Sequence, residues 1–233
     1  MEKKLKSWQG WLLFGGTMVV VFVLGMIAAS VNERHAEVSS VMNNKKTEIT
    51  GIEARNDKFE PNYPREYQTW EATADTSFKS LYNGNQAVDV LEARPEMVIL
   101  WAGYAFSKDY STPRGHMHAI EDMRNTLRVG APMTENEGPQ PATCWTCKSP
   151  DVPRMMQAMG VDNFYKGKWA SLGKEIVNPI GCADCHEPEN MNLHISRPAL
   201  IEAFQRQGKD ITKATQQEMR SLVCAQCHVE YYF

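Results

Sequence analysis

The sequence predicts a mainly α-helical protein with long loops, preceded by an N-terminal helix that could cross a membrane. Three observations lead to this prediction. The first 32 residues contain a long uncharged apolar run, several later segments carry apolar residues at helical spacing between capping signals, and no alternating strand pattern recurs. The apolar content after the first run is low for so many loops, which is typical of a chain that packs around something other than protein.

Residues 1–32 predict a signal anchor or transmembrane helix. Three lysines precede an uncharged stretch that begins at Trp8 and is longer than the ~7–15 apolar residues of a cleaved signal. It reaches the roughly 20 residues that a membrane-spanning helix needs. Arg34 is the only positively charged residue just after this stretch. The distribution of positive charges therefore predicts that the N-terminus stays inside and the rest is exported. Because Ala28 and Ser30 also fit a cleavage site, we expect an extracytoplasmic protein that is either anchored to the cytoplasmic membrane or released.

The remainder of the chain divides by composition. Residues 33–60 are polar without an apolar period and predict a tether, whereas residues 61–233 predict one folded domain. In this domain the run Met97–Phe106 is apolar enough to be buried, although its spacing fits a strand as well as a helix. The net charge of −3 and the lack of a basic stripe argue against nucleic acid as a partner.

Three helices are signalled more clearly in the domain. Residues 116–132 place four apolar residues on one helical face and end with glycine and proline. These apolar residues are Ala119, Ile120, Met123 and Leu127. Pro198 predicts the start of a second helix and Gly208 its end. A third helix is expected to begin at Thr212 and to run into the last cysteine motif.

All six cysteines lie in C-x-x-C pairs. The pairs are Cys144 with Cys147, Cys182 with Cys185, and Cys224 with Cys227. His186 and His228 follow the second and third pairs, and C-x-x-C-H is typical of the covalent attachment of haem c. Two cysteines at this spacing reach the two vinyl groups on one porphyrin edge, and the next residue ligates the iron.

Other uses of the cysteines are weaker. Six cysteines in an exported chain would suit disulfides, but adjacent C-x-x-C pairs followed by histidine are an unusual disulfide framework. Zinc would accept two C-x-x-C pairs, but the gap from Cys147 to Cys182 is longer than in a zinc ribbon. Thioredoxin-like chemistry lacks its βαβ surroundings. The motifs therefore favour haem c.

Lys148 stands where the other two motifs have histidine. A protonated lysine, with an ordinary pKa of ~10.4, cannot ligate iron, so the metal would have to displace the proton. From the residues alone, Lys148 is either an iron ligand or a surface lysine beside a disulfide or a lost haem site.

Several segments together resemble the ammonia-forming cytochrome c nitrite reductases. The segments are "VILWAGYAFSKDYSTPRGH", "CWTCKSPDV", "GKWA", "GCADCH" and "CAQCHVEYYF". The resemblance runs from about Asn56 to Phe233. It implies a multihaem cytochrome c fold, with three haem c groups in this chain and five in the family. Because the family's enzymes are roughly twice this length, we expect the chain to correspond to their N-terminal half.

The resemblance implies that nitrite is reduced to ammonia at a haem ligated by Lys148. Arg128 matches the family's active-site arginine, which attracts nitrite and stabilises negative charge. It is expected in the last turn of the helix after His116, ~18 Å away along a continuous axis. Tyr231 matches the active-site tyrosine, and Glu230 and the Tyr231 carbonyl match two calcium ligands.

The other two haems would relay electrons, with His186 and His228 as near-side iron ligands. His116 matches the far-side partner of His228, and two Fe–N bonds of about 2 Å would place their ring nitrogens roughly 4 Å apart. The family's far-side ligand for the His186 haem lies beyond this sequence. His118 and His194 match no ligand of the family and are expected to be ordinary hydrogen-bonded histidines.

The resemblance also bears on partners. The family's electron donor is often a membrane multihaem quinol dehydrogenase, and its dimers rest largely on C-terminal helices, so a homodimer is not expected here. The alternative function is a tri-haem electron carrier without its own substrate. Arg114 and Arg124 are expected to be structural.

Overall fold

The computed structural model describes residues 6–43, 46–79, 81, 85–129 and 140–229, with the backbone alone for 40–43. The chain forms two compact units, Met1–Lys46 and Thr47–Phe233, and we describe each by itself. Glu230 and Tyr231 lie outside the described residues, so their predicted roles in calcium binding and catalysis remain predictions.

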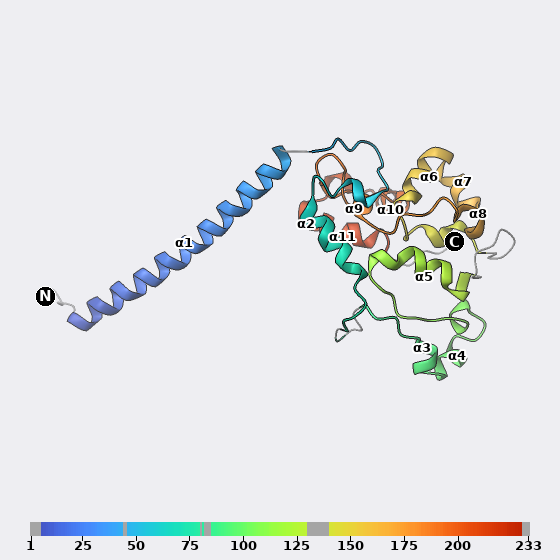
Figure 1. Cartoon of the computed structure of the whole chain (residues 1–233), viewed down its shortest axis with the longest axis horizontal. Coiled ribbons are helices and arrows are strands. Elements are labelled where there is room, and N and C mark those ends of the chain that lie inside the picture. Colours follow the sequence, from blue (N-terminus) through green and yellow to red (C-terminus); the bar gives the residue numbers. More distant parts are fainter. Residues whose placement is uncertain (1–5, 44–45, 80, 82–84, 130–139, 230–233) are drawn as a thin grey trace. The chain divides into compact units, whose positions relative to one another are not determined.

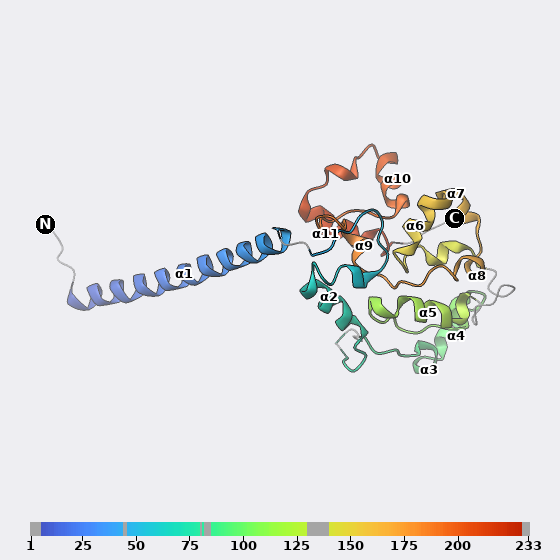
Figure 2. The ribbon, with the colours of Figure 1, turned by 45° about the horizontal axis from the view of Figure 1, so that its top comes forward.

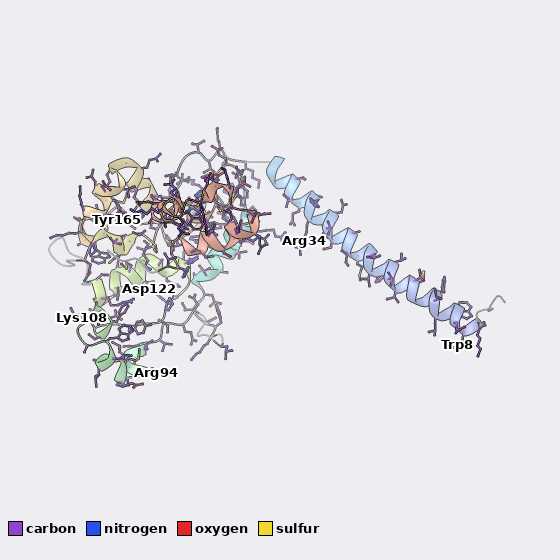
Figure 3. The ribbon with its side chains drawn as sticks, turned by 180° about the vertical axis from the view of Figure 1, so that it is seen from behind. Trp8, Arg34, Arg94, Lys108, Asp122 and Tyr165 are labelled. Carbon is purple, nitrogen blue, oxygen red and sulfur yellow. The ribbon has the colours of Figure 1, made fainter. Side chains whose placement is uncertain are left out.

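The first unit contains one long helix, α1 (Ser7–Asn43), seen in blue in Figure 1. Its side chains stand out around the helix from Trp8 to Arg34, and its apolar part is not buried inside the protein (Figure 3). Its 37 residues extend ~55 Å, against ~30 Å for the hydrocarbon core of a bilayer. By length and composition this helix can cross a membrane, as the sequence predicts.

The polar segment 33–60, predicted as a tether, is structured at both ends. Helix α1 continues through it to Asn43, and residues from Thr47 onward belong to the second unit. Phe59 and Asn56 are buried there. Asn56 can be buried because its amide donates to a main-chain carbonyl at 3.2 Å and accepts the Cys182 N–H at 2.9 Å.

The second unit is built from short helices joined by long loops (Figures 1 and 2). Its α-helices are α2 (Pro64–Glu71), α3 (Val90–Ala93), α4 (Glu96–Leu100), α5 (Ala119–Asn125), α6 (Asp151–Met159), α7 (Val161–Lys166), α8 (Trp169–Leu172), α9 (Cys182–Cys185), α10 (Pro198–Arg206) and α11 (Gln216–Ala225). Short 3-10 turns occupy Asn56–Lys58, Ala72–Ala74, Ala105–Ser107, His116–His118, Leu127–Val129, Ala142–Trp145 and Ile211–Lys213. The described residues form isolated β-bridges but no sheet, which confirms the predicted mainly α fold.

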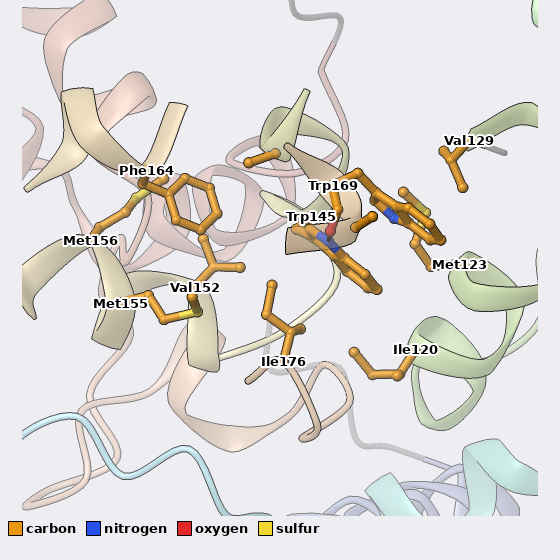
Figure 4. Close-up of a cluster of buried hydrophobic side chains, with 12 residues drawn as sticks. Ile120, Met123, Val129, Trp145, Val152, Met155, Met156, Phe164, Trp169 and Ile176 are labelled. Carbon is orange, nitrogen blue, oxygen red and sulfur yellow. Dashed lines mark hydrogen bonds between the residues drawn. The ribbon is translucent and has the colours of Figure 1, made fainter. Parts of the chain in front are cut away.

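The hydrophobic core surrounds the first cysteine motif. Trp145, between the two cysteines of that motif, stacks on Trp169 with 4° between the ring planes and 5.5 Å between centroids (Figure 4). The Trp145 indole N–H donates to the Trp169 carbonyl at 2.8 Å. Phe164, Val152 and Ile176 are fully buried around this pair. The core therefore fixes the first motif through its own tryptophan.

The predicted single helix over residues 116–132 is wrong. The chain instead forms a 3-10 turn, then α5, and then a second 3-10 turn that carries Arg128. Thr126 breaks the helix with an extended backbone, because the Asp109 carboxylate accepts both the Thr126 hydroxyl at 2.8 Å and the Leu127 N–H at 2.9 Å. The ~18 Å estimate along one axis therefore does not apply.

The two later helices follow the sequence signals in part. Pro198 begins α10, and Gly208 after it adopts a φ of +70°, as a helix stop requires. The next helix, α11, begins after Thr215 and not at Thr212. Thr215 forms a capping box with Glu218, since the Glu218 N–H donates to the Thr215 hydroxyl and the Thr215 N–H donates to the Glu218 carboxylate.

The predicted burial of Met97–Phe106 is also wrong for this structure. Helix α4 lies with α3 at one edge of the second unit (Figure 2), and Ile99 and Leu100 are 81% and 70% exposed. The aromatic residues after α4 pack together, since the Trp101 ring lies against Phe106 with centroids 5.0 Å apart. No described element covers the aliphatic face of α4.

Candidate haem-binding site

Each cysteine motif forms a helical turn. In the second motif (residues 182–186) and the third motif (residues 224–228), the main-chain N–H of the histidine donates to the main-chain carbonyl of the first cysteine at 2.8 Å. Positions i and i+3 of such a turn lie on one face, so both thiols of a pair point to the same side. All six cysteines are free thiols. This geometry suits attachment of both thiols to one porphyrin edge.

The first motif (residues 144–148) closes differently. The Lys148 N–H donates to the Trp145 carbonyl at 2.9 Å, three residues back, so this turn is tighter than the other two. Lys148 is half-buried. Burial raises the pKa of the Cys144 thiol, and the positive charges of Lys148 and Arg128 oppose that rise. Two cations thus lie within electrostatic range of the first motif.

The thiols of different motifs lie close to one another. Burial raises the pKa of Cys182 to about 11 and that of Cys185 to about 12. A hydrogen bond with the Cys147 thiol and then burial raise the pKa of Cys227. The first and third motifs are therefore in contact through their second cysteines. A charge on Cys224 would further raise the pKa of Cys185, so the second motif is also near the third.

His186 has the arrangement of an iron ligand. Its Nδ1 lies 2.7 Å from the Met191 carbonyl, and since a carbonyl only accepts, Nδ1 carries the proton. The lone pair of Nε2 is then free for a metal, and such a second hydrogen bond is typical of metal-ligating histidines. Met191, which provides this carbonyl, has a left-handed backbone conformation with a φ of +59°. These residues fit the second haem attachment predicted from the sequence.

His116 shares its surroundings with two other predicted ligands. His116 is exposed to solvent. The protein around it nevertheless lowers the pKa of its imidazole by desolvation. The charge of Asp184 opposes this shift, and the charges of His228 and Lys148 add to it. Four segments far apart in sequence therefore meet at one region. The predicted 4 Å pairing of His116 with His228 stays a prediction.

The two remaining histidines have other surroundings. The ring nitrogens of His118 lie 3.0 Å from the Ala74 carbonyl and 3.3 Å from the Glu121 carboxylate, so both are already engaged. His194 donates its main-chain N–H to the Cys185 carbonyl, and burial lowers the pKa of its ring. His118 has no ring nitrogen left for a metal.

Arg128 is half-buried beside the first motif. Its guanidinium carbon lies 5.2 Å from the centroid of the Phe106 ring, and its Nε donates to the Thr126 hydroxyl at 3.3 Å. Within the part of the chain that the structure describes, no acceptor pairs with its two terminal nitrogens. The bond from Thr126 to Asp109 fixes the turn that presents Arg128. The arrangement leaves a cation able to bind an anion near Lys148.

The other two arginines of this segment serve the fold. Arg114 binds the carboxylates of Asp122 and Glu121. Arg124 donates to main-chain carbonyls of residues 173 and 176 at 3.1 and 3.0 Å. Both guanidinium groups are engaged by protein acceptors.

A buried cluster that the sequence patterns do not predict surrounds Arg197, which contacts Asp184 and Gln226. Burial alone would lower the pKa of Arg197, but the charge of Asp184 leads the opposing effects, and the pKa is raised. One signal was available, because every motif carries a polar residue directly before its second cysteine.

Comparison with known proteins places the chain among cytochromes. The cytochrome c552 family model matches residues 55–233. A cytochrome c-552 of Parabacteroides distasonis is 99% identical over all 233 residues, and one of Bacteroides fragilis is 76% identical over the same length. One of Aliarcobacter butzleri is 49% identical over 223 residues. The chain spans about half the length of these relatives, 47% for the first two and 43% for the third.

A solved structure shows the same fold. The catalytic subunit of cytochrome c nitrite reductase from Desulfovibrio desulfuricans, described with two calcium sites, aligns with a TM-score of 0.74 at 32% identity. The alignment covers 80% of this chain and 42% of that subunit. The family model also covers most of the second unit, including all three cysteine motifs. The chain therefore belongs to the cytochrome c552 family.

Proposed function

We propose that this chain binds three haem c groups and provides the lysine-ligated catalytic site of an ammonia-forming nitrite reductase. The observation that carries the proposal is the placement of Arg128 near the motif of Lys148. Val129, the neighbour of Arg128, is buried in the same hydrophobic core as Trp145 of that motif, and the charges of Arg128 and Lys148 both oppose the rise in the pKa of the Cys144 thiol. The likeness to a cytochrome c nitrite reductase at 32% identity supports it.

The chain's residues divide the work at the first motif. Reduction of nitrite to ammonium takes six electrons and eight protons, and a haem iron, when bound, supplies the coordination site and passes the electrons. Cys144 and Cys147 would hold the porphyrin, and Lys148 would offer its neutral amine to the iron after releasing its proton to solvent. Arg128 binds the nitrite anion and stabilises developing negative charge. Tyr231 donates a hydrogen bond and helps proton delivery.

The second and third motifs serve electron supply in this proposal. His186 would ligate one haem, and His228 with His116 would ligate the other. Axial ligands are a main control on haem potential, so two imidazole ligands suit a relay. Glu230 and the Tyr231 carbonyl contribute to a calcium site, since calcium prefers oxygen ligands.

The first unit supports a location for the protein within this proposal. Helix α1 either anchors the chain to the cytoplasmic membrane or acts as an export signal, and the haem-binding unit lies on the extracytoplasmic side. Electrons then come from a membrane donor such as a multihaem quinol dehydrogenase.

The proposal is tested on the chain expressed with a c-type cytochrome maturation system. Intact mass and haem staining should report three covalent haems, and nitrite should change the absorption of one of them. Replacing Cys144 and Cys147 by alanine should remove one haem and the nitrite response together. The matched change at Cys182 and Cys185 should remove one haem and keep the response. Three six-coordinate irons without any nitrite response would indicate an electron carrier.

A further inference from the structure

Arg197 is a fully buried arginine that contacts two cysteine motifs with its side chain. Its Nε donates to the Thr146 carbonyl at 2.6 Å, inside the first motif. Its Nη2 donates to the Ser149 carbonyl at 2.9 Å and to the Asp184 carboxylate, which lies inside the second motif. Both members of the Arg197–Asp184 ion pair are shielded from water, at 0% and 2% exposure.

The third motif joins the same cluster through Gln226, which is also fully buried. Its Oε1 accepts the main-chain N–H groups of Arg197 at 3.1 Å and Ser196 at 2.9 Å. Its Nε2 donates to the Asp184 carbonyl at 2.7 Å. The second and third motifs are thus bonded to each other as well as to Arg197.

The three motif residues share one position. Thr146, Asp184 and Gln226 each stand directly before the second cysteine of their motif. A buried ion pair that served stability alone would need only the carboxylate of Asp184 and no contact with the other two motifs. Here, the donors of Arg197 reach the equivalent position of all three motifs, within one residue of three thiols that would carry haem.

The chemistry of arginine explains why one residue can hold this arrangement. The guanidinium is planar and presents its donors in a rigid fork, so the places of its acceptors relative to one another are fixed. The charge cannot be lost at physiological pH, and without Asp184 it would be buried and unpaired. A lysine at this position would keep the charge but could not hold three acceptors in one plane.

We propose that Arg197 is a positioning residue that sets the spacing and orientation of the three haem-attachment motifs relative to one another. We call Arg197 with its contacts Thr146, Ser149, Asp184 and Gln226 the Arg197 clamp. This inference rests on the proposed haem binding. The clamp fixes the distances between haem edges, whereas the iron ligands, at other residues, fix the properties of each haem separately.

The test uses the haem-loaded full chain with Arg197→Met and Arg197→Lys. The Soret circular dichroism couplet reports the distance and angle between haems, whereas the absorption spectrum reports the ligands of each iron. We expect three haems and an unchanged absorption spectrum in both variants, with a loss or sign change of the couplet. The midpoint of thermal unfolding should fall by about 6 to 20 °C in Arg197→Met, because a buried carboxylate loses its partner.

Two further variants make the result decisive. Arg206→Met, at the exposed end of α10, is the matched control and should leave the couplet unchanged. If Arg197→Met does not accumulate, Gln226→Met decides, since it releases the third motif alone and should also alter the couplet.

The outcomes separate the two proposals. An unchanged couplet in the loaded Arg197 or Gln226 variants would overturn the clamp and leave the proposed function intact. A changed absorption spectrum with an unchanged couplet would show that Arg197 acts on single haems, which also overturns it. A wild-type chain without covalent haem would overturn the proposed function and, with it, this inference.

Discussion

At the scale of single residues, the proposed anion site depends on how Arg128 is held. Asp109 bonds the Thr126 hydroxyl and the Leu127 N–H, and Thr126 accepts the Arg128 Nε–H. The Arg128 guanidinium also lies over the Phe106 ring in a cation–π contact. A chain of neutral and charged hydrogen bonds therefore sets the direction of one cation.

Replacing Arg128 by methionine should weaken nitrite binding. A hydrogen bond from a charged donor contributes about 1.5–3 kcal/mol, so the dissociation constant for nitrite should rise about 10- to 150-fold. The measurement is a nitrite titration followed by absorption. Arg94→Met, at an exposed arginine, is the control and should bind nitrite as wild type does. Equal affinities in the two variants would remove Arg128 from the site.

Replacing Lys148 by alanine should separate attachment from ligation. The two thiols still bind the porphyrin, so intact mass should still report three haems, while one iron loses its near-side ligand. Electron paramagnetic resonance should then show a changed signal for one haem of the three. Lys166→Ala, in α7, should leave every signal unchanged. A wild-type spectrum for Lys148→Ala would mean that another group ligates this iron.

At the scale of elements, sequence patterns predict helix ends that neighbouring residues determine and miss those that distant residues determine. The signals that end α10 are local, and Pro198 and Gly208 act as predicted. The break after α5 depends on Asp109, which lies 17 residues before Thr126, and no periodicity reports such a bond. Helix α11 begins after Thr215 and not at the predicted Thr212, because Thr215 forms a capping box with Glu218.

The capping box of α11 should make the stability of the protein depend on pH. Hydrogen bonds from Thr215 lower the pKa of the Glu218 carboxyl below its ordinary value. A lowered pKa contributes stability above that value and loses it as the pH falls through the folded pKa. Thr215→Ala should cost about 1 kcal/mol at neutral pH and less in acid. Urea unfolding at both pH values measures this, and Ser221→Ala should show no such pH dependence.

At the scale of the whole molecule, the site was predictable where covalent spacing defines it. The cysteine motifs and the order Lys148, His186, His228 come directly from the sequence. Arg197 did not, because its partners Thr146 and Gln226 lie 51 and 29 residues away. Buried polar contacts of this range depend on the packed structure and leave no spacing rule along the chain.

The two-unit organisation predicts that the first unit can be removed. A chain that begins at Thr47 behind a cleavable export signal should be recovered entirely in the soluble extracytoplasmic fraction. Its haem content and unfolding midpoint should match those of the full chain, because α1 buries none of its apolar window inside the protein. Fractionation, intact mass and thermal unfolding check this. A lower midpoint would show that α1 stabilises the second unit.

The Arg197 clamp joins residues that are synthesised at different times. Synthesis runs from the N-terminus, so Thr146, Asp184 and Arg197 are all made before Gln226. Until Gln226 arrives, the Arg197 N–H and the Asp184 carbonyl lack the side chain that bonds them. The guanidinium contacts that join the first two motifs do not need Gln226, so this pair can form first and the third motif is added to it last.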